Sequence, residues 1–349
     1  MKTSGHPFFA GMSVTRRLLQ ALDKTQKRDA LFLPKDRVVV GLSGGPDSTA
    51  LLLLLKKIEK KLMLRLCAAH LNHGLSPQAV LFERFCRKLA KKHDVPFVSK
   101  KVNVRKIARR NKKTIEEAGR DARYAFFCET ARRFRAKKIA TAHTLDDHAE
   151  TVLMRLIRGS GLKGLTGIHK SRREGNTRVV RPLLDIPKKD LILFLRGCSQ
   201  PYLVDASNKE QDFTRNRVRH RLLPLLRKEF NPRIDETLAR LAHTASSAAD
   251  WIGDVSENAW KRCLLKRGVR RVDLDAFRWA SLPPAIGDEV IWKALECLQG
   301  NRLRIGYAHL AAIRELLRSP GGKAAWIHLP NGIRVHKKNT RASLTLLKG

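Results

Sequence analysis

Short apolar runs alternate with longer amphipathic stretches over the first half of the chain. Apolar runs of strand length, which indicate strands covered on both faces of a sheet, lie at 37–42, 64–70, 95–102 and 138–142. Stretches with the length of helices lie between them, at 48–61, 77–92, 115–135 and 146–158. Because parallel strands need crossover helices, this alternation predicts an α/β fold with a doubly wound parallel sheet.

The pattern changes after residue 182. Helices are predicted at 188–197, from 233 to about 267, at 284–298 and at 308–317, and the Gly- and Pro-punctuated tail is typical of short antiparallel strands. We therefore predict three parts: an N-terminal extension over 1–34 with a helical piece around 14–23, the α/β domain over 35–224, and a mostly helical α+β domain over 225–349.

The charge of the chain favours a polyanionic partner. Its 349 residues include 71 Lys and Arg but only 32 Asp and Glu, which gives a formal net charge of +39. Nucleic acid is the favoured partner and an acidic membrane surface the alternative, because phosphate contacts release counterions. The longest purely apolar run, 50–55, is too short to span a bilayer, and the N-terminal apolar stretch is too short for a signal peptide. We expect a cytosolic protein without a transmembrane helix.

The six cysteines are scattered singly, and no CxxC pair occurs. They are Cys67, Cys86, Cys128, Cys198, Cys263 and Cys297. This spacing argues against a zinc site, an iron–sulfur cluster and a disulfide framework, and most of these side chains are expected to be buried.

A phosphate-binding loop is predicted between the first strand and the helix that follows it. Two glycines let backbone amides turn toward an anion, serine hydroxyls add donors, and the helix N-terminus favours negative charge. The alternative is a glycine turn capped by serines. The lysine of GxxxxGK[ST] is missing, and the loop resembles the pyrophosphate loop, SGGxDS, of ATP pyrophosphatases. Its residues are Ser43, Gly44, Gly45, Pro46, Asp47 and Ser48.

A second group follows the strand at 138–142. His143, Asp147 and Glu150 are spaced i, i+4 and i+7, which predicts one helix face directed into the same crevice as the loop. Such a trio binds a metal or a cationic amine. The alternative, acidic residues that open a helix, explains Asp146 well but the histidine and the glutamate poorly.

Two basic segments add candidate phosphate contacts. Residues 100–138 carry 15 basic and 4 acidic side chains, which predicts part of an RNA track, and within them Arg120 and Arg123 are spaced i and i+3. For Arg120 alone, a surface salt bridge is the more common outcome. In the segment 215–221 arginines recur at every second residue. Whether these arginines stabilise the domain junction or contact phosphates stays open.

Taken in order, these segments resemble those of the tRNA(Ile)-lysidine synthetases. The resemblance covers nearly all of residues 36–225 and rests on SGGPDS, HLNHGLS, EEAGRDARYAFF, AHTLDDHAETVLMRLIRGSGLKGLTGI, RPLL and DASNKEQDFTRNRVRHRLLPLL. It implies a pyrophosphate-loop ATP pyrophosphatase catalytic domain followed by a tRNA-recognition domain. The chain ends after what resembles the family's first C-terminal domain, and we expect no further domain.

The resemblance implies a ligase that uses ATP to adenylate the wobble cytidine of a CAU-anticodon isoleucine tRNA. The ε-amine of free L-lysine then displaces AMP and forms lysidine. ATP and Mg²⁺ are the implied cofactors, and the oligomeric state stays open, with a homodimer as one option.

The same resemblance implies the roles of individual residues. The loop residues Ser43, Gly44, Gly45, Pro46, Asp47 and Ser48 would bind ATP, with Asp47 and Asp147 near Mg²⁺. Arg123 and His143 would stabilise phosphates or the intermediate. Asp147 and Glu150 would hold lysine or assist its deprotonation. His70, Asn72 and His73 would line the nucleotide pocket, with a purely structural histidine the alternative for His73.

Two other functions remain as alternatives. A pyrophosphate-loop tRNA thiolase would share the ATP site, but it normally needs the paired cysteines that this chain lacks. A non-enzymatic RNA-binding protein would explain the charge, but it gives no reason for SGGPDS together with His143, Asp147 and Glu150.

Overall fold

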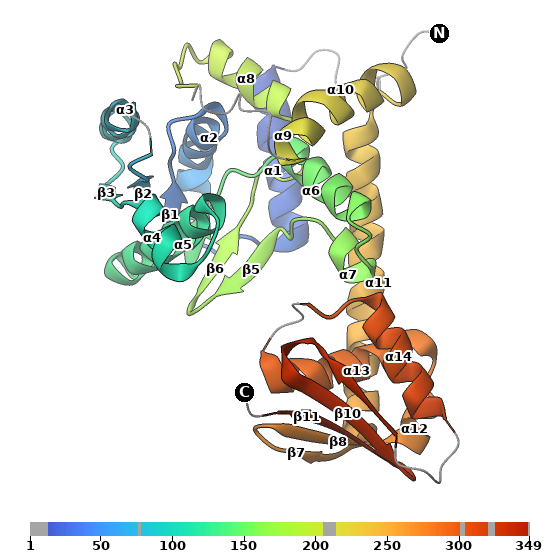
Figure 1. The fold of residues 1–349 in the computed structure, drawn as a ribbon. Coiled ribbons are helices and arrows are strands. Elements are labelled where there is room, and N and C mark those ends of the chain that lie inside the picture. The colour runs from blue at the N-terminus through green and yellow to red at the C-terminus, as the bar shows by residue number, and fades with distance from the viewer. Residues whose placement is uncertain (1–12, 76–77, 205–213, 301–303, 320–324, 348–349) are drawn as a thin grey trace. The chain divides into compact units, whose positions relative to one another are not determined.

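A computed structural model describes residues 13–75, 78–204, 214–300, 304–319 and 325–347 (Figure 1). The chain divides into two compact units, one up to His243 and one from Thr244 onward. The sequence-based boundary at 224/225 stays a prediction of domain organisation. Among the described residues, no helix has both the length and the apolar composition that crossing a bilayer requires.

The first unit contains the predicted parallel sheet. Its strands are β1 (Arg37–Gly41), β2 (Arg65–Asn72), β3 (Phe97–Lys101), β4 (Lys138–Ala140), β5 (Ser171–Glu174) and β6 (Thr177–Val180). They are arranged in the order β3-β2-β1-β4-β6-β5, and only the edge strand β5 runs antiparallel to its neighbour. The first four strands confirm the sequence prediction, whereas the β5–β6 hairpin was not predicted.

Helices cover this sheet on both faces. The helices of the unit are α1 (Val14–Asp29), α2 (Pro46–Leu62), α3 (Ala79–Lys92), α4 (Val104–Asn111), α5 (Ile115–Phe134), α6 (Leu145–Ile157), α7 (Leu162–Leu165), α8 (Lys188–Gly197), α9 (Thr214–Arg217) and α10 (Leu223–Leu225). In β1, Val38 and Val40 belong to the core formed with α1, α2, α3 and α8, while Val39 faces the core formed with α5. Alternate residues of one strand therefore serve opposite layers, which confirms the doubly wound fold.

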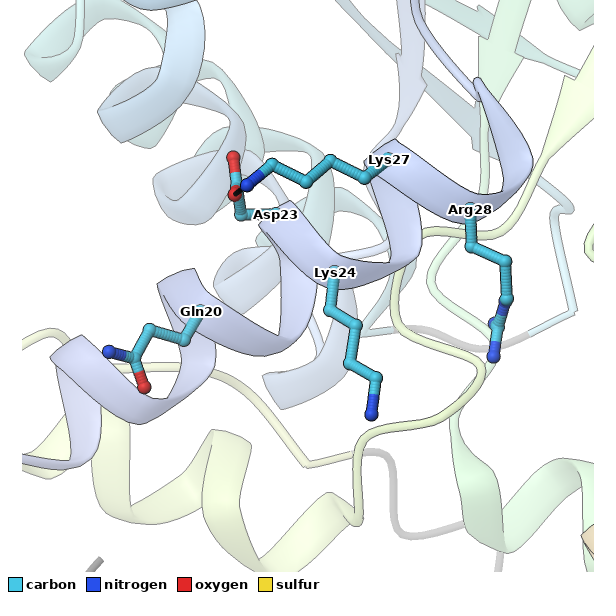
Figure 2. A pocket seen from close by; sticks show the side chains of 5 residues that line it. All are labelled: Gln20, Asp23, Lys24, Lys27 and Arg28. Carbon is cyan, nitrogen blue, oxygen red and sulfur yellow. Dashed lines mark ion pairs between the residues drawn. The ribbon is translucent and has the colours of Figure 1, made fainter. Parts of the chain in front are cut away.

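Helix α1 is part of this core. Leu18 and Leu22 are 3% and 4% exposed and pack into the same cluster as Leu31, Phe32 and the residues of α2. Its opposite face is polar: Gln20, Asp23, Lys24, Lys27 and Arg28 line a shallow depression of about 530 Å³ (Figure 2). There Asp23 pairs with Lys27 and Lys61, as on a solvated helix face. The described part of the predicted extension thus completes the α/β unit.

The second unit is an antiparallel sheet with helices on one face. Its strands are β7 (Leu264–Arg267), β8 (Arg271–Asp275), β9 (Ala325–Leu329), β10 (Ile333–Lys338) and β11 (Arg341–Leu346), in the order β7-β8-β11-β10-β9. Its helices are α12 (Ala276–Ala280), α13 (Pro284–Gln299), α14 (Tyr307–Arg318) and the C-terminal part of α11 (Ile234–Cys263). The helical plus antiparallel composition confirms the α+β prediction, but residues 264–267, predicted as helix, form a strand.

We predict that α1 contributes to the stability of the first unit. Leu22→Ala removes a buried side chain and leaves a cavity, so the free energy of unfolding should fall by about 2–5 kcal/mol. Lys24→Ala, on the exposed face of the same helix, should change it by less than about 0.5 kcal/mol. Urea denaturation of the full chain measures both values. Equal effects of the two substitutions would contradict the packing of α1 on the core.

Candidate active site at the carboxyl ends of the parallel strands

The loop between β1 and α2 has a conformation that requires glycine. Gly44 has φ +90°, and a Cβ atom there would lie 3.2 Å from the Phe82 ring and 3.3 Å from Cys86 Sγ. The Gly44 carbonyl accepts a hydrogen bond of 2.9 Å from the Leu203 amide. An L side chain would therefore meet both backbone strain and the side chains of α3.

The serines and the start of α2 shape this loop for an anion. Ser48 Oγ lies 3.1 Å from the Ser43 amide nitrogen and 3.0 Å from Ser43 Oγ. No side chain caps the N-terminus of α2, where Gly45 is the cap residue and Pro46 begins the helix. Amides of the first helical turn have no intrahelical acceptor, and the helix dipole adds partial positive charge. This conformation is suited to an anion, and phosphate binding by the loop stays a prediction.

Only one of the two carboxylate oxygens of Asp47 is hydrogen-bonded to a described residue. Its Oδ2 accepts a hydrogen bond of 2.8 Å from Lys188 Nζ, whereas Oδ1 is buried and has no hydrogen-bond partner among the described residues. Burial raises the pKa of this carboxyl above its ordinary value, against the opposing effect of the Lys188 ammonium. A buried oxygen without a donor is a suitable ligand for a hard cation.

The residues present fit a Mg²⁺ ion held partly by substrate. In the described ranges, no three or more His, Cys, Asp or Glu side chains are grouped to hold a metal. Magnesium is commonly bound by one or two carboxylates together with substrate phosphates and water, so such a group is not required. Asp47 Oδ1 is the oxygen with a free position for it.

Helix α6 places Asp147 and Glu150 but not His143 on its surface. Thr144 is the cap residue, and its side chain and that of Asp147 bond each other's backbone amides in a capping box. His143 precedes the cap, so the predicted helical spacing does not apply to it; its Nδ1 lies 3.1 Å from Thr141 Oγ1. Burial and the charge of Arg181 lower the pKa of His143 to about 4. The ring is therefore neutral at pH 7.

The acidic pair is bridged by an arginine. Arg219 donates through NH2 to Asp147 Oδ1 at 2.9 Å and to Glu150 Oε2 at 3.1 Å, and through Nε to Glu150 Oε1. Arg215 Nε also donates to Glu150 Oε2, at 3.3 Å. Burial opposes the charge of Asp147, but bonds from Thr144 and the nearby His143 and Arg219 hold its pKa below the ordinary value. Each of the two carboxyl groups thus has a guanidinium partner.

Two of the closely spaced arginines therefore have defined partners. Arg215 and Arg219 are four residues apart, in α9 and the π-helical segment Val218–Leu222, and both contact acidic side chains of the first unit. The i, i+4 spacing was visible in the sequence, but their partner was not. Lys188, at the start of α8, was missed as a site residue because nothing near it in sequence indicates Asp47.

Polar side chains after β2 are engaged in local bonds. His70 Nδ1 lies 2.9 Å from the Leu42 carbonyl oxygen, and Asn72 Oδ1 accepts a bond of 3.0 Å from the Gly74 amide. Arg123 NH2 lies 3.3 Å from His73 Nε2. Burial, aided by the charge of Arg123, lowers the pKa of His73 to about 4. These contacts shape the edge of the site, and the proposed roles of the four residues in nucleotide binding stay predictions.

Arg120 contacts an aromatic ring. Its guanidinium carbon lies 5.1 Å from the centre of the Tyr124 ring.

Parts of two motifs named above, the segment 205–213 and Ser76, lie outside the described residues.

Comparison with known proteins identifies a matching family and several similar proteins. Residues 12–226 match the family model ATP_bind_3, described as a PP-loop domain. The chain is similar to proteins named tRNA(Ile)-lysidine synthase: 34% identical to that of Clostridium acetobutylicum, over 89% of this chain and 66% of the relative, and 32% identical to that of Clostridioides difficile, over 92% and 69%. The relative from Geobacter sulfurreducens is 36% identical, over 87% of this chain and 64% of the relative. The chain thus spans about two thirds of these relatives.

Among solved structures, the chain resembles the U34-tRNA thiolase NcsA from Methanococcus maripaludis, determined with its [4Fe-4S] cluster. The TM-score is 0.56 and the identity 20%, over 66% of this chain and 79% of the thiolase. This likeness supports the fold alone.

We predict that His148 makes the fold sensitive to acid. It is 7% exposed, its Nδ1 accepts a bond of 3.1 Å from the Ile168 amide, and burial lowers its pKa to about 4. Since the unfolded chain binds this proton near pH 6.5, stability is fully present above that pH and is lost as the pH falls toward 4. Between pH 7 and pH 5 the loss should be about 2 kcal/mol.

His148→Asn keeps an acceptor close to Nδ1 but does not titrate. Urea denaturation at both pH values should show a smaller difference in unfolding free energy for this variant than for the wild type. The same difference in both proteins would contradict this role of His148.

Proposed function

The chain belongs to the tRNA(Ile)-lysidine synthase family of PP-loop proteins, and we propose that it ligates L-lysine to the wobble cytidine of a CAU-anticodon isoleucine tRNA at the expense of ATP. The observation that carries this proposal is the joining of two sites at one sheet edge. A loop suited to an anion follows β1, and an acidic pair with arginine partners, the buried Glu150 and the half-buried Asp147, follows β4.

In the proposed first step, the 2-carbonyl oxygen of the cytidine attacks the α-phosphorus of ATP and pyrophosphate leaves. Ser43, Ser48 and the first amides of α2 would bind the phosphates. Mg²⁺ would neutralise charge on those phosphates, held by Asp47 and Asp147. Lys188, which donates to Asp47 Oδ2, would lie beside the same charges. Arg123 and His143 would stabilise the phosphates or the adenylated intermediate.

In the second step, the ε-amine of lysine attacks C2 of the cytidine and AMP leaves. Free lysine carries ammonium groups and a carboxylate. The cluster of Asp147, Glu150, Arg215 and Arg219 contains partners of both signs. An incoming ammonium would share these carboxylates with the guanidinium groups. The ammonium must lose a proton before it attacks, and a carboxylate beside it can accept that proton.

The surface charge supports an RNA substrate. With 71 basic and 32 acidic residues, the chain retains many basic groups that no carboxylate of its own can neutralise. The segment 100–138, which includes α4 and α5, remains the predicted RNA track of the first unit.

A thiolase activity is less well supported. The thiolase of similar fold is described with an iron–sulfur cluster. This sequence has no CxxC pair, and its described residues include no cluster of metal-binding side chains. A non-enzymatic RNA-binding role would leave the loop and the acidic pair without a purpose.

We predict ATP-dependent incorporation of labelled lysine into unmodified isoleucine tRNA with a CAU anticodon. Methionine tRNA, which has the same anticodon, is the control and should receive little label. Acid-precipitable label and AMP formation are measured together. AMP formation without label in either tRNA would support the nucleotide chemistry but exclude lysine as the nucleophile.

We predict that Asp147→Asn abolishes lysine incorporation but leaves tRNA binding nearly intact. The amide can still accept the bond from Thr144 that caps α6, but it removes the negative charge beside Arg219. Lysine incorporation should fall by at least about 30-fold, whereas tRNA affinity should be unchanged. The matched control is Glu116→Gln, which removes an exposed carboxylate partner of Arg215 and should have little effect. Comparable lysine turnover in Asp147→Asn and wild type would exclude the proposed role.

A further inference from the structure

One face of the second unit's sheet is covered by helices and the other is polar. Apolar side chains such as Val272, Val335 and Leu344 point into the core formed with α13 and α14. Because side chains alternate along a strand, the residues between them lie on the opposite face. That face carries Trp326 and His328 of β9, Arg334, His336 and Lys338 of β10, Arg341, Ser343 and Thr345 of β11, and Arg271 and Asp273 of β8.

The strand registers arrange these residues in rows across the sheet. One row runs from Trp326 through His336 and Ser343 to Asp273. The next runs from His328 through Arg334 and Thr345 to Arg271. Rows two residues apart along a strand are separated by about 7 Å. An aromatic and imidazole row therefore lies beside a row that carries two guanidinium groups.

Residues of both rows line a hollow on this face. It has a volume of about 270 Å³ and is lined by Arg271, Trp326, Arg334, His336, Ser343 and Thr345. Trp326 is 59% exposed, so its indole ring is accessible to a ligand in this hollow. Pockets for complete small-molecule ligands usually measure about 300–1,000 Å³, so this hollow suits part of a larger ligand.

The charge of the hollow is positive. Asp273 is 3% exposed, and it accepts a bond of 2.7 Å from Arg271 Nε, so its charge is already used to orient that arginine. Arg271 NH2 also donates to Ser343 Oγ at 3.0 Å. Arg334, exposed in the same row as Arg271, has no ion pair with a described residue. An anion would thus find one oriented and one unpaired guanidinium.

We propose that this face binds an unpaired nucleotide of the RNA substrate, with the base stacked on Trp326 and the phosphate between Arg271 and Arg334. The inference rests on the proposed function only for the identity of the RNA. An indole stacks on any base, guanidinium groups match phosphate, and the hydroxyl and imidazole groups of the same hollow can bond ribose or base edges. An acidic protein would satisfy the arginines but would give no reason for an exposed indole at their side.

The test measures the affinity of the full chain for unmodified CAU-anticodon isoleucine tRNA, without ATP and lysine. Trp326→Ala should weaken binding by about 5- to 100-fold, whereas Trp326→Phe, which keeps a stacking ring, should stay within about threefold of wild type. Phe277→Ala is the matched control, since Phe277 is an exposed aromatic residue, 75% exposed, on α12 of the same unit. It should bind tRNA as the wild type does.

The salt dependence separates stacking from charge. Arg334→Ala should reduce the slope of log affinity against log salt concentration by about 1, because one phosphate contact is lost. Trp326→Ala should lower the affinity without changing this slope. A loss of affinity in Arg334→Ala alone would overturn the stacked nucleotide, and unchanged binding in both variants would overturn the whole surface.

Lysine incorporation by the same proteins distinguishes this inference from the proposed function. If lysine incorporation is normal and tRNA binding does not depend on Trp326, the proposed nucleotide-binding face is rejected but the proposed ligase activity stands. If tRNA binding depends on Trp326 but no lysine is incorporated, the nucleotide-binding face stands and the ligase activity is rejected.

Discussion

The parallel strands of the first unit direct their carboxyl ends to one edge of the sheet, and the candidate site depends on this constraint. Parallel strands can be joined only by crossovers, so each strand must end where the previous one did. The phosphate loop follows β1, and His143 with α6 follows β4, its neighbour in the sheet. Residues separated by about a hundred positions are thereby brought to one edge of the sheet, with Lys188 bonded to Asp47 across 141 residues.

Charge compensation is the second determinant of the site. Glu150 is 2% exposed, and an unpaired carboxylate at that depth would cost several kcal/mol in desolvation. Arg215 and Arg219 supply the compensation and hold α9 and the following π-helical turn against α6. The same cluster would offer charges of both signs to the proposed lysine substrate. The contacts that stabilise this part of the fold are therefore also those that a bound amino acid would share.

The second unit uses the alternation of strand residues differently. Its sheet buries one face against α13 and α14, and the described residues of the other face are mostly polar. Basic side chains can occupy that face at little cost because they keep their hydration. The excess of basic residues is thus distributed over both units, and the open sheet face adds the aromatic side chain that a purely electrostatic surface lacks.

The sequence by itself determined the alternation of strands and helices, the glycine loop at 43–48 and the bounds of helices such as 188–197, because these depend on local periodicity, turn residues and caps. It did not reveal the short strands β5 to β8, which have only four or five residues each and include many charged ones. Only the tertiary structure decided that Arg219 bridges Asp147 and Glu150 and that Lys188 pairs with Asp47. Such pairs join positions 69 to 141 residues apart, and their geometry follows from the order of strands in the sheet rather than from any local pattern.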